Sequence, residues 1–139
     1  MKTTSELLNE IKTAPSMKVF FENNTEELTN STLTDYLKQL LTSKSMTRSE
    51  AIRASDLSQD YAYQIFSGRK KPSRDKLIRL ALGMKLSLDE TSRLFVLADT
   101  GALYPRLRRD AVIIFCIEHH LSVMTANELL DSLGFYTLA

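Results

Sequence analysis

Residues 47–73 of this 139-residue chain read TRSEAIRASDLSQDYAYQIFSGRKKPS, the pattern of two short helices joined by a tight turn. Thr47 is suited to cap the first helix, because the Glu50 carboxylate three residues later can accept from the Thr47 amide. Ser58 can cap the second helix through its hydroxyl oxygen. Gly68 stands where a left-handed residue would end that helix, and a basic loop follows it. These signals predict a helix-turn-helix.

The second helix of this stretch has two distinct faces when its residues are placed 100° apart. Ala62, Ile65 and Phe66 follow the i, i+3, i+4 spacing and should face the core. The opposite side and its flanks carry the polar and phenolic residues Gln59, Asp60, Tyr61, Tyr63, Gln64 and Ser67. Amide side chains pair with adenine edges and carboxylates accept from cytosine, so this face suits base recognition. The alternative is the ordinary solvated face of an amphipathic helix.

The segment from about Leu33 to about Ala98 resembles the DNA-binding domain of the lambda-repressor-like (XRE/Cro-type) helix-turn-helix regulators. The stretches that carry the resemblance are Thr47-Arg48, Leu57-Ser58, Tyr63 through Lys70, Pro72-Ser73 and Leu77 through Glu90. The resemblance implies an all-α fold with a five-helix DNA-binding core. It also implies a transcriptional regulator that binds double-stranded DNA sequence-specifically through a recognition helix at about 58–67.

The same resemblance implies which residues would contact DNA. Base contacts would come from the recognition helix, at Gln59, Asp60, Tyr63 and Gln64. Phosphate contacts would come from residues around it, at Thr47, Arg48, Ser58, Tyr61, Arg69, Lys70 and Lys71. The chain departs from the family pattern at Ile52, where a small residue is usual, and at Asp56, where glycine is common. Ile52 predicts a different approach of the two helices or a one-residue shift, and aspartate can adopt the left-handed conformation, though less readily than glycine.

Charge is distributed unevenly along a chain whose net charge is only +1. Residues 45–85 hold nine basic and four acidic residues, a net charge of +5, whereas residues 1–35 and 86–139 each carry −3. A concentration of positive charge on the helix-turn-helix segment is expected of a module that approaches phosphates on one face. A chance cluster of solvated lysines would give the same pattern.

The rest of the chain predicts further helices. Apolar spacing predicts one from about Thr32 to Ser43, one from about Ser73 to Met84 that buries Leu80 or Ile78, and one from Ser87 that ends at Gly101. We therefore expect an N-terminal helical arm at 1–30 packed on the main body, a helix-turn-helix domain at 31–101 and a helical extension at 102–139. In the arm, Thr3 and Glu6 form a capping box, and residues 17–21 are either a helical turn or an extended stretch.

The C-terminal extension should contain two helices. Arg106 through Glu118 is apolar on almost every side, so we expect it to be buried all round, under the N-terminal arm or under a second subunit. A capping box at Thr125 and Glu128 should begin the last helix, and the apolar end of the chain should dock on the core. We therefore expect the C-terminal helices to support a homodimer.

Other functional classes find little support in the sequence. The single cysteine, Cys116, predicts a buried free thiol and a reducing, cytoplasmic location. The longest apolar run, 111–117, is too short to cross a bilayer, so no membrane partner is expected. His119 and His120 are adjacent and point about 100° apart on a helix, so no metal site is expected. No catalytic constellation or cofactor motif occurs, which predicts that the protein is not an enzyme.

The rival hypothesis is a protein-interaction module, adaptor or antitoxin-like, that retains the helix-turn-helix fold without binding DNA. It is favoured by Ile52, by Asp56, by Asp60 on the groove-facing side and by the near-neutral net charge. The two tyrosines on the recognition helix also favour it, because aromatic residues are enriched at protein interfaces.

Overall fold

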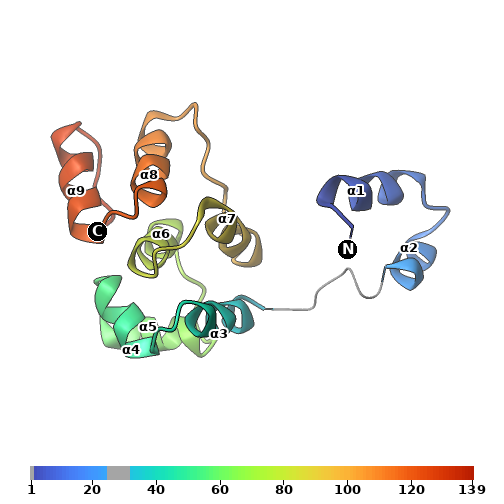
Figure 1. Cartoon of the computed structure of the whole chain (residues 1–139), viewed down its shortest axis with the longest axis horizontal. Helices are drawn as coiled ribbons and strands as arrows, with labels where there is room; N and C mark the ends of the chain where they lie inside the picture. The colour runs from blue at the N-terminus through green and yellow to red at the C-terminus, as the bar shows by residue number, and fades with distance from the viewer. Residues whose placement is uncertain (1, 25–31) are drawn as a thin grey trace. The chain divides into compact units, whose positions relative to one another are not determined.

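The structure is a computed structural model that describes residues 2–24 and 32–139 (Figure 1). All regular structure in these two ranges is α-helical, which confirms the predicted fold class. The chain divides into two compact units, Met1–Ser31 and Thr32–Ala139.

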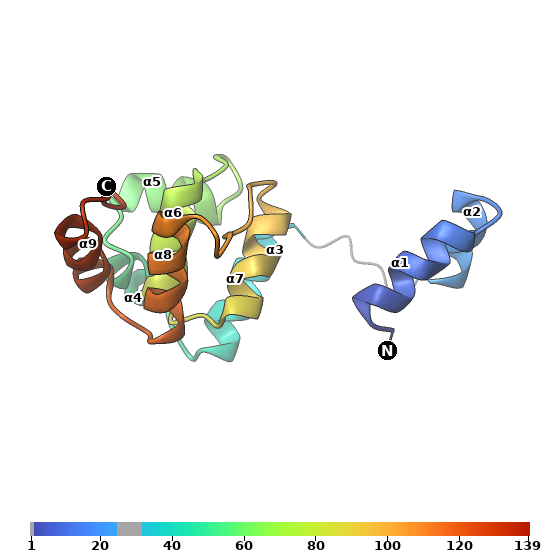
Figure 2. The same cartoon turned by 90° about the horizontal axis from the view of Figure 1, so that it is seen from above.

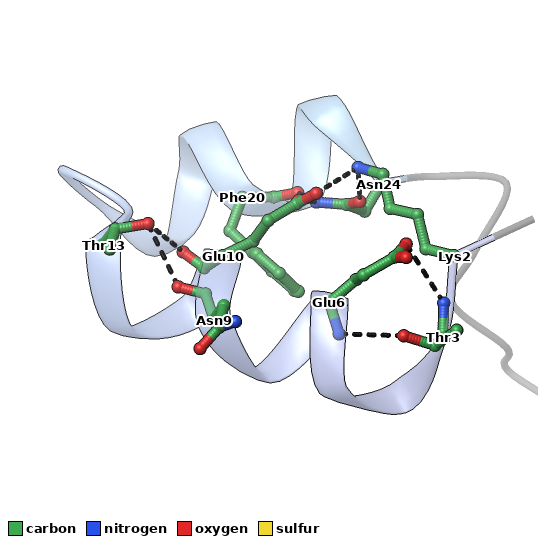
Figure 3. A network of polar contacts seen from close by, with 8 residues as sticks. All are labelled: Lys2, Thr3, Glu6, Asn9, Glu10, Thr13, Phe20 and Asn24. Carbon is green, nitrogen blue, oxygen red and sulfur yellow. Dashed lines mark hydrogen bonds and ion pairs between the residues drawn. The ribbon is translucent and has the colours of Figure 1, made fainter.

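The N-terminal unit is a hairpin of α1 (Thr4–Thr13) and α2 (Met17–Asn23), so residues 17–21 are helical. The predicted capping box, in which Thr3 and Glu6 exchange hydrogen bonds, begins α1. Figure 3 shows the contacts that join the two helices near the end of α2. There, Asn24 Nδ2 donates to Glu10 Oε2 at 2.7 Å.

The larger unit contains α3 (Leu33–Ser43), α4 (Arg48–Ala54), α5 (Gln59–Phe66), α6 (Arg74–Gly83), α7 (Leu88–Leu97), α8 (Arg108–Glu118) and α9 (Val123–Ser132). Figures 1 and 2 show α6 in the middle of this unit, and it packs against α4, α7, α8 and α9. Every residue from Leu77 to Gly83 is buried, including both Ile78 and Leu80. The helix that is buried all round is therefore α6.

Within the larger unit, the helix before Glu118 is buried on one face and not on every side. Ile113, Cys116 and Ile117 of α8 face the core, but Phe115 is 49% exposed. A helix on the surface of the unit needs only one buried face, and α8 uses that face against α6, α7 and α9. Coverage of its outer face by the N-terminal arm or by a second subunit stays a prediction.

A four-residue link joins α3 to α4, α4 to α5, α6 to α7 and α8 to α9. Each link has a helix-ending residue, a left-handed residue, an apolar residue and a Ser or Thr that caps the next helix. The links are 44–47, 55–58, 84–87 and 119–122, with left-handed φ values of 54°, 55°, 54° and 52° at Ser45, Asp56, Lys85 and His120. In each, the apolar residue donates its backbone N–H to a carbonyl five residues back, as in a Schellman motif.

Several helix ends differ from the sequence-based prediction. α7 ends at Leu97, not at Gly101, because Asp99 adopts the left-handed conformation with φ 55°. α9 is capped by Ser122, whose Oγ accepts from the Thr125 amide, so the capping box predicted at Thr125 does not form. α8 begins at Arg108, two residues later than expected.

Two further predictions about chain ends and caps were tested. Ser73 stands at the N-cap of α6, as predicted, but its side chain makes no capping hydrogen bond. The C-terminal end does dock on the core through Leu138, which is fully buried, whereas Tyr136 is 90% exposed.

Candidate nucleic-acid interface

The helix-turn-helix consists of α4, the link 55–58 and α5, and its inner face is apolar as predicted. Ala62, Ile65 and Phe66 are 0%, 1% and 3% exposed. Ser58 caps α5 by accepting from the Tyr61 amide at 3.4 Å, and Gly68 follows the helix in a left-handed conformation with φ 81°. The caps and the apolar face therefore lie where the sequence predicted them.

The four predicted base-contacting residues, Gln59, Asp60, Tyr63 and Gln64, are all exposed. Three of them border a surface hollow of about 430 Å³ that is lined by Arg48, Asp60, Tyr63, Gln64, Ser67 and Arg69. The Arg48 guanidinium lies 4.6 Å from the centre of the Tyr63 ring, a cation–π distance. This stack brings a cation of α4 to the polar face of α5.

Three hydroxyl groups predicted to contact phosphates each accept a backbone N–H. Thr47 Oγ1 accepts from the Glu50 amide at 3.1 Å, Ser58 accepts as described, and the Tyr61 hydroxyl accepts from the Ser73 amide at 3.4 Å. A hydroxyl that accepts in this way keeps its own hydrogen, which can be donated to a phosphate oxygen. The internal hydrogen bonds therefore hold these groups in place without using their donors.

The loop after α5 is positively charged, and lysines from the loop and from α6 lie near the Tyr61 ring. Lys70 Nζ lies 5.0 Å from the centre of the Tyr61 ring, and Lys76 Nζ, from α6, lies 5.9 Å from it. Lys71 forms an exposed ion pair with Asp99 at 3.6 Å. The sequence-based prediction missed Lys76, because only folding brings the first turn of α6 to the aromatic ring.

Three other arginines form ion pairs or hydrogen bonds with groups of the protein itself. Arg74 pairs with the buried Asp110 at 2.7 Å, and Arg109 pairs with Asp75 at 3.0 Å. Arg79, only 8% exposed, donates to backbone carbonyls. Within residues 2–24 and 32–139, by contrast, the candidate phosphate-binding residues Arg48, Arg69 and Lys70 form no ion pair. Three of the four candidate phosphate-binding cations are therefore unpaired, and the fourth, Lys71, pairs with Asp99.

The two departures from the family pattern have structural explanations. Asp56 takes the left-handed conformation that glycine would favour, with φ 55°. Ile52 is 4% exposed and packs in the core, while the neighbouring Ala51 is fully buried and supplies a small side chain. A non-glycine residue in the left-handed position is the rule for all four links of this fold, so the turn geometry does not depend on glycine.

Other chemistry-bearing residues lie away from this face. Cys116 is fully buried, and its burial raises the pKa of the thiol. His119 ends α8 and stacks on Phe115, with ring centres 4.1 Å apart. In the part of the chain that the structure describes, no three His, Cys, Asp or Glu residues could hold a metal ion together. No helix among those residues is long and apolar enough to span a bilayer.

Two short helices, α4 and α5, joined by a turn with a left-handed residue and packed through apolar faces, form a helix-turn-helix. Residues 37–90 match the family model described as Helix-turn-helix. This segment, from α3 to the first turn of α7, belongs to the XRE/lambda-repressor-like family, whose members are generally DNA-binding regulators. No curated protein and no solved structure matches the chain significantly.

Proposed function

We propose that this protein binds double-stranded DNA in a sequence-specific manner and acts as a transcriptional regulator. In this proposal α5 enters the major groove and presents Gln59, Asp60, Tyr63 and Gln64 to base edges. Gln side chains suit adenine and the Asp60 carboxylate suits the amino group of cytosine.

The observation that carries the proposal is a difference between two groups of cationic residues, those paired within the fold and those exposed around α5. Arg74, Arg79 and Arg109 each form an ion pair and hydrogen bonds within the fold. Arg48, Arg69 and Lys70 are exposed around α5. A cation that is solvated in the free protein can exchange its counterions for a phosphate, which is the main source of affinity for DNA. Their hydroxyl neighbours Thr47, Ser58 and Tyr61 would position the backbone of the duplex.

The test is selection of bound fragments from a random double-stranded DNA pool, followed by a salt titration on the enriched sequence. A recovered motif whose affinity falls steeply with salt supports the proposal. Arg69→Ala and Lys70→Ala should each reduce the slope of log affinity against log salt by about 1. Arg108→Ala is the matched control, because it removes an exposed cation from α8, which Figure 1 shows across α6 from α5. No enriched motif would reject the proposal.

The proposal includes a homodimer through the C-terminal helices, since helix-turn-helix proteins usually read two half-sites about one turn apart. Exposed apolar residues support this surface: Leu107, Phe115, Met124 and Leu133. A second copy of the chain is the expected occupant. Size-exclusion chromatography with light scattering should give twice the mass of one chain, and Phe115→Asp should restore the monomer. A monomer at all concentrations would reject the dimer and leave DNA binding as a separate question.

A protein-interaction module without DNA binding is the second candidate. It is favoured by the exposed Tyr63, 42% accessible, beside the carboxylate Asp60 on the same helix face. The substitutions Tyr63→Ala and Gln64→Ala separate the two candidates. Loss of base discrimination supports DNA reading, whereas unchanged behaviour towards DNA with loss of a bound protein supports the interaction module.

A further inference from the structure

Arg79 joins the helix-turn-helix to the C-terminal tail, residues 135–139. Its side chain lies in the buried part of α6, and its three nitrogens each donate to a different backbone carbonyl. Nε donates to Ser55 O at 3.2 Å, Nη2 donates to Asp56 O, and Nη1 donates to Leu138 O at 3.3 Å. The first two acceptors begin the link between α4 and α5, and the third belongs to the tail.

The tail is held against the core by contacts from two helices besides α6. The Leu138 side chain is fully buried, and its backbone N–H donates to Asn127 Oδ1 of α9 at 2.8 Å. Arg109 of α8 donates to the carbonyl oxygens of Tyr136 and Thr137, each at 3.0 Å. Tyr136 is 90% exposed, whereas Phe135 is partly buried against the core, so the tail docks through its backbone, Phe135 and Leu138.

The carbonyls that Arg79 holds lie where the chain changes direction between the two helices of the motif. Ser55 is fully buried and its hydroxyl donates to Ala51 O at 2.7 Å, while Asp56 is the left-handed residue. A non-glycine residue in this conformation is strained relative to a right-handed one. The hydrogen bonds from Arg79 favour the turn in the observed conformation and offset part of that strain.

A buried guanidinium must have its donors satisfied, because an unpaired buried charge is strongly unfavourable. The Leu138 carbonyl supplies one acceptor, and the tail also covers this part of the core. If the tail leaves, Arg79 loses an acceptor and gains access to water, so its hold on Ser55 and Asp56 should weaken. The turn would then be freer to rotate, and α5 would follow it.

We infer that Arg79 and Leu138 are positioning residues for the DNA-reading helix. The C-terminal tail supplies one acceptor for the Arg79 guanidinium, the Leu138 carbonyl. The guanidinium holds the link between α4 and α5 through its hydrogen bonds to the Ser55 and Asp56 carbonyls. The effect on DNA affinity rests on the proposed function. The effect on the turn does not, because it can be measured without DNA.

The test compares the full chain with Leu138→Ala and with a chain that ends at Phe135, using amide hydrogen exchange. Both variants should exchange about tenfold faster at residues 55–58 and in the first turn of α5, because local opening becomes easier there. Exchange in α7 should stay unchanged. Tyr136→Ala is the matched control, since it alters an exposed side chain of the same tail and should leave exchange at 55–58 unchanged.

Unchanged exchange at 55–58 in both variants would overturn the inference. A uniform increase that includes α7 would also overturn it, because the tail would then be a general part of the core. Affinity for the selected DNA should fall about tenfold in the two variants and stay unchanged in Tyr136→Ala. If the full chain binds no DNA, the proposed function fails, while the exchange data still decide whether the tail holds the turn.

A second variant covers the case in which the shortened chain does not fold. Arg79→Lys keeps the positive charge, but a lysine ammonium lacks the planar fork that reaches three separated carbonyls. Exchange at residues 55–58 should again rise by about tenfold relative to α7. Exchange like that of the unaltered chain would show that the turn does not depend on the guanidinium.

Discussion

Two helix pairs of this protein share one type of link and differ in the surface they carry. The α4–α5 link and the α8–α9 link each contain a left-handed residue, a leucine and a capping serine: Asp56, Leu57 and Ser58 in the first, and His120, Leu121 and Ser122 in the second. The polar face of α5 is flanked by Arg48, Arg69 and Lys70. The exposed residues of α9 include Glu128, Asp131 and Met124, without a cation.

The difference teaches that the link and the function are separate properties of the sequence. A Schellman ending followed by a serine cap joins two helices wherever the apolar residue between them can be buried. Attraction to phosphate depends instead on the side chains outside the link: cations flank the polar face of α5 and outnumber its Asp60, whereas no cation of α9 offsets Glu128 and Asp131. We therefore propose DNA contacts for α5 and none for α9.

The largest expected effect comes from Gly83→Ala. This substitution should disrupt the packing of α4 on α6 and leave the α8–α9 pair unaffected. A Cβ at Gly83 would lie 2.4 Å from Ser55 Oγ and 2.6 Å from Ser55 N, closer than atoms can approach. Separating α4 from α6 should lower the free energy of unfolding by about 3 kcal/mol, measured by urea denaturation. Gly101→Ala is the control, since its Cβ would meet nothing within 4 Å. Equal stability of the two variants would contradict the close approach.

The next effect sharpens the functional difference between the pairs. Gln64→Ala should weaken binding to the selected DNA by about 1–3 kcal/mol, the value of a good contact to a base. Glu128→Ala, on the exposed face of α9, should not weaken it. Fluorescence anisotropy with labelled duplexes measures both. If the two substitutions changed affinity equally, the assignment of α5 as the reading helix would be wrong.

A smaller effect tests the shared part of the two pairs. Ser58→Ala and Ser122→Ala each remove a cap that accepts a backbone N–H, so each should cost about 1 kcal/mol of stability in thermal unfolding. Only Ser58→Ala should also weaken DNA binding, because only that hydroxyl is proposed to donate to a phosphate. A loss of affinity in Ser122→Ala beyond its effect on stability would argue against this division.

The smallest effect concerns the α6–α7 link, where the Glu90 carboxylate takes part in the cap as well as Ser87. Desolvation raises the pKa of Glu90, but hydrogen bonds from the Ser87 amide and from Lys44 outweigh it and hold that pKa below its ordinary value of 4.5. The ionised group therefore stabilises the fold above pH 4.5, and this stability is lost as pH falls through the folded-state pKa. Glu90→Gln should reduce the fall in melting temperature on acidification. An unchanged pH profile would count against this role.

Local features of the helix-turn-helix followed from the sequence. The caps at Thr47 and Ser58, the buried face of α5 and the left-handed Gly68 all depend on residues within four positions of one another. The same kind of reasoning predicts burial on all sides of α8, whereas within the larger unit only one face is buried and Phe115 is half-exposed. Periodicity shows which residues can be buried, but the number of neighbouring helices decides how many are. The contacts with DNA stay a prediction.

The sequence by itself determined the all-helical class, the helix-turn-helix segment and its cluster of positive charge, because these are encoded in residues close along the chain. Only the tertiary structure decided which cations remain available. Arg74 is neutralised by Asp110 from α8, and Arg79 is held by carbonyls of Ser55, Asp56 and Leu138. These partners are distant in sequence, and only the packing of α8 and the tail around α6 brings them together. That packing leaves Arg48, Arg69 and Lys70 exposed beside α5 and without an ion pair.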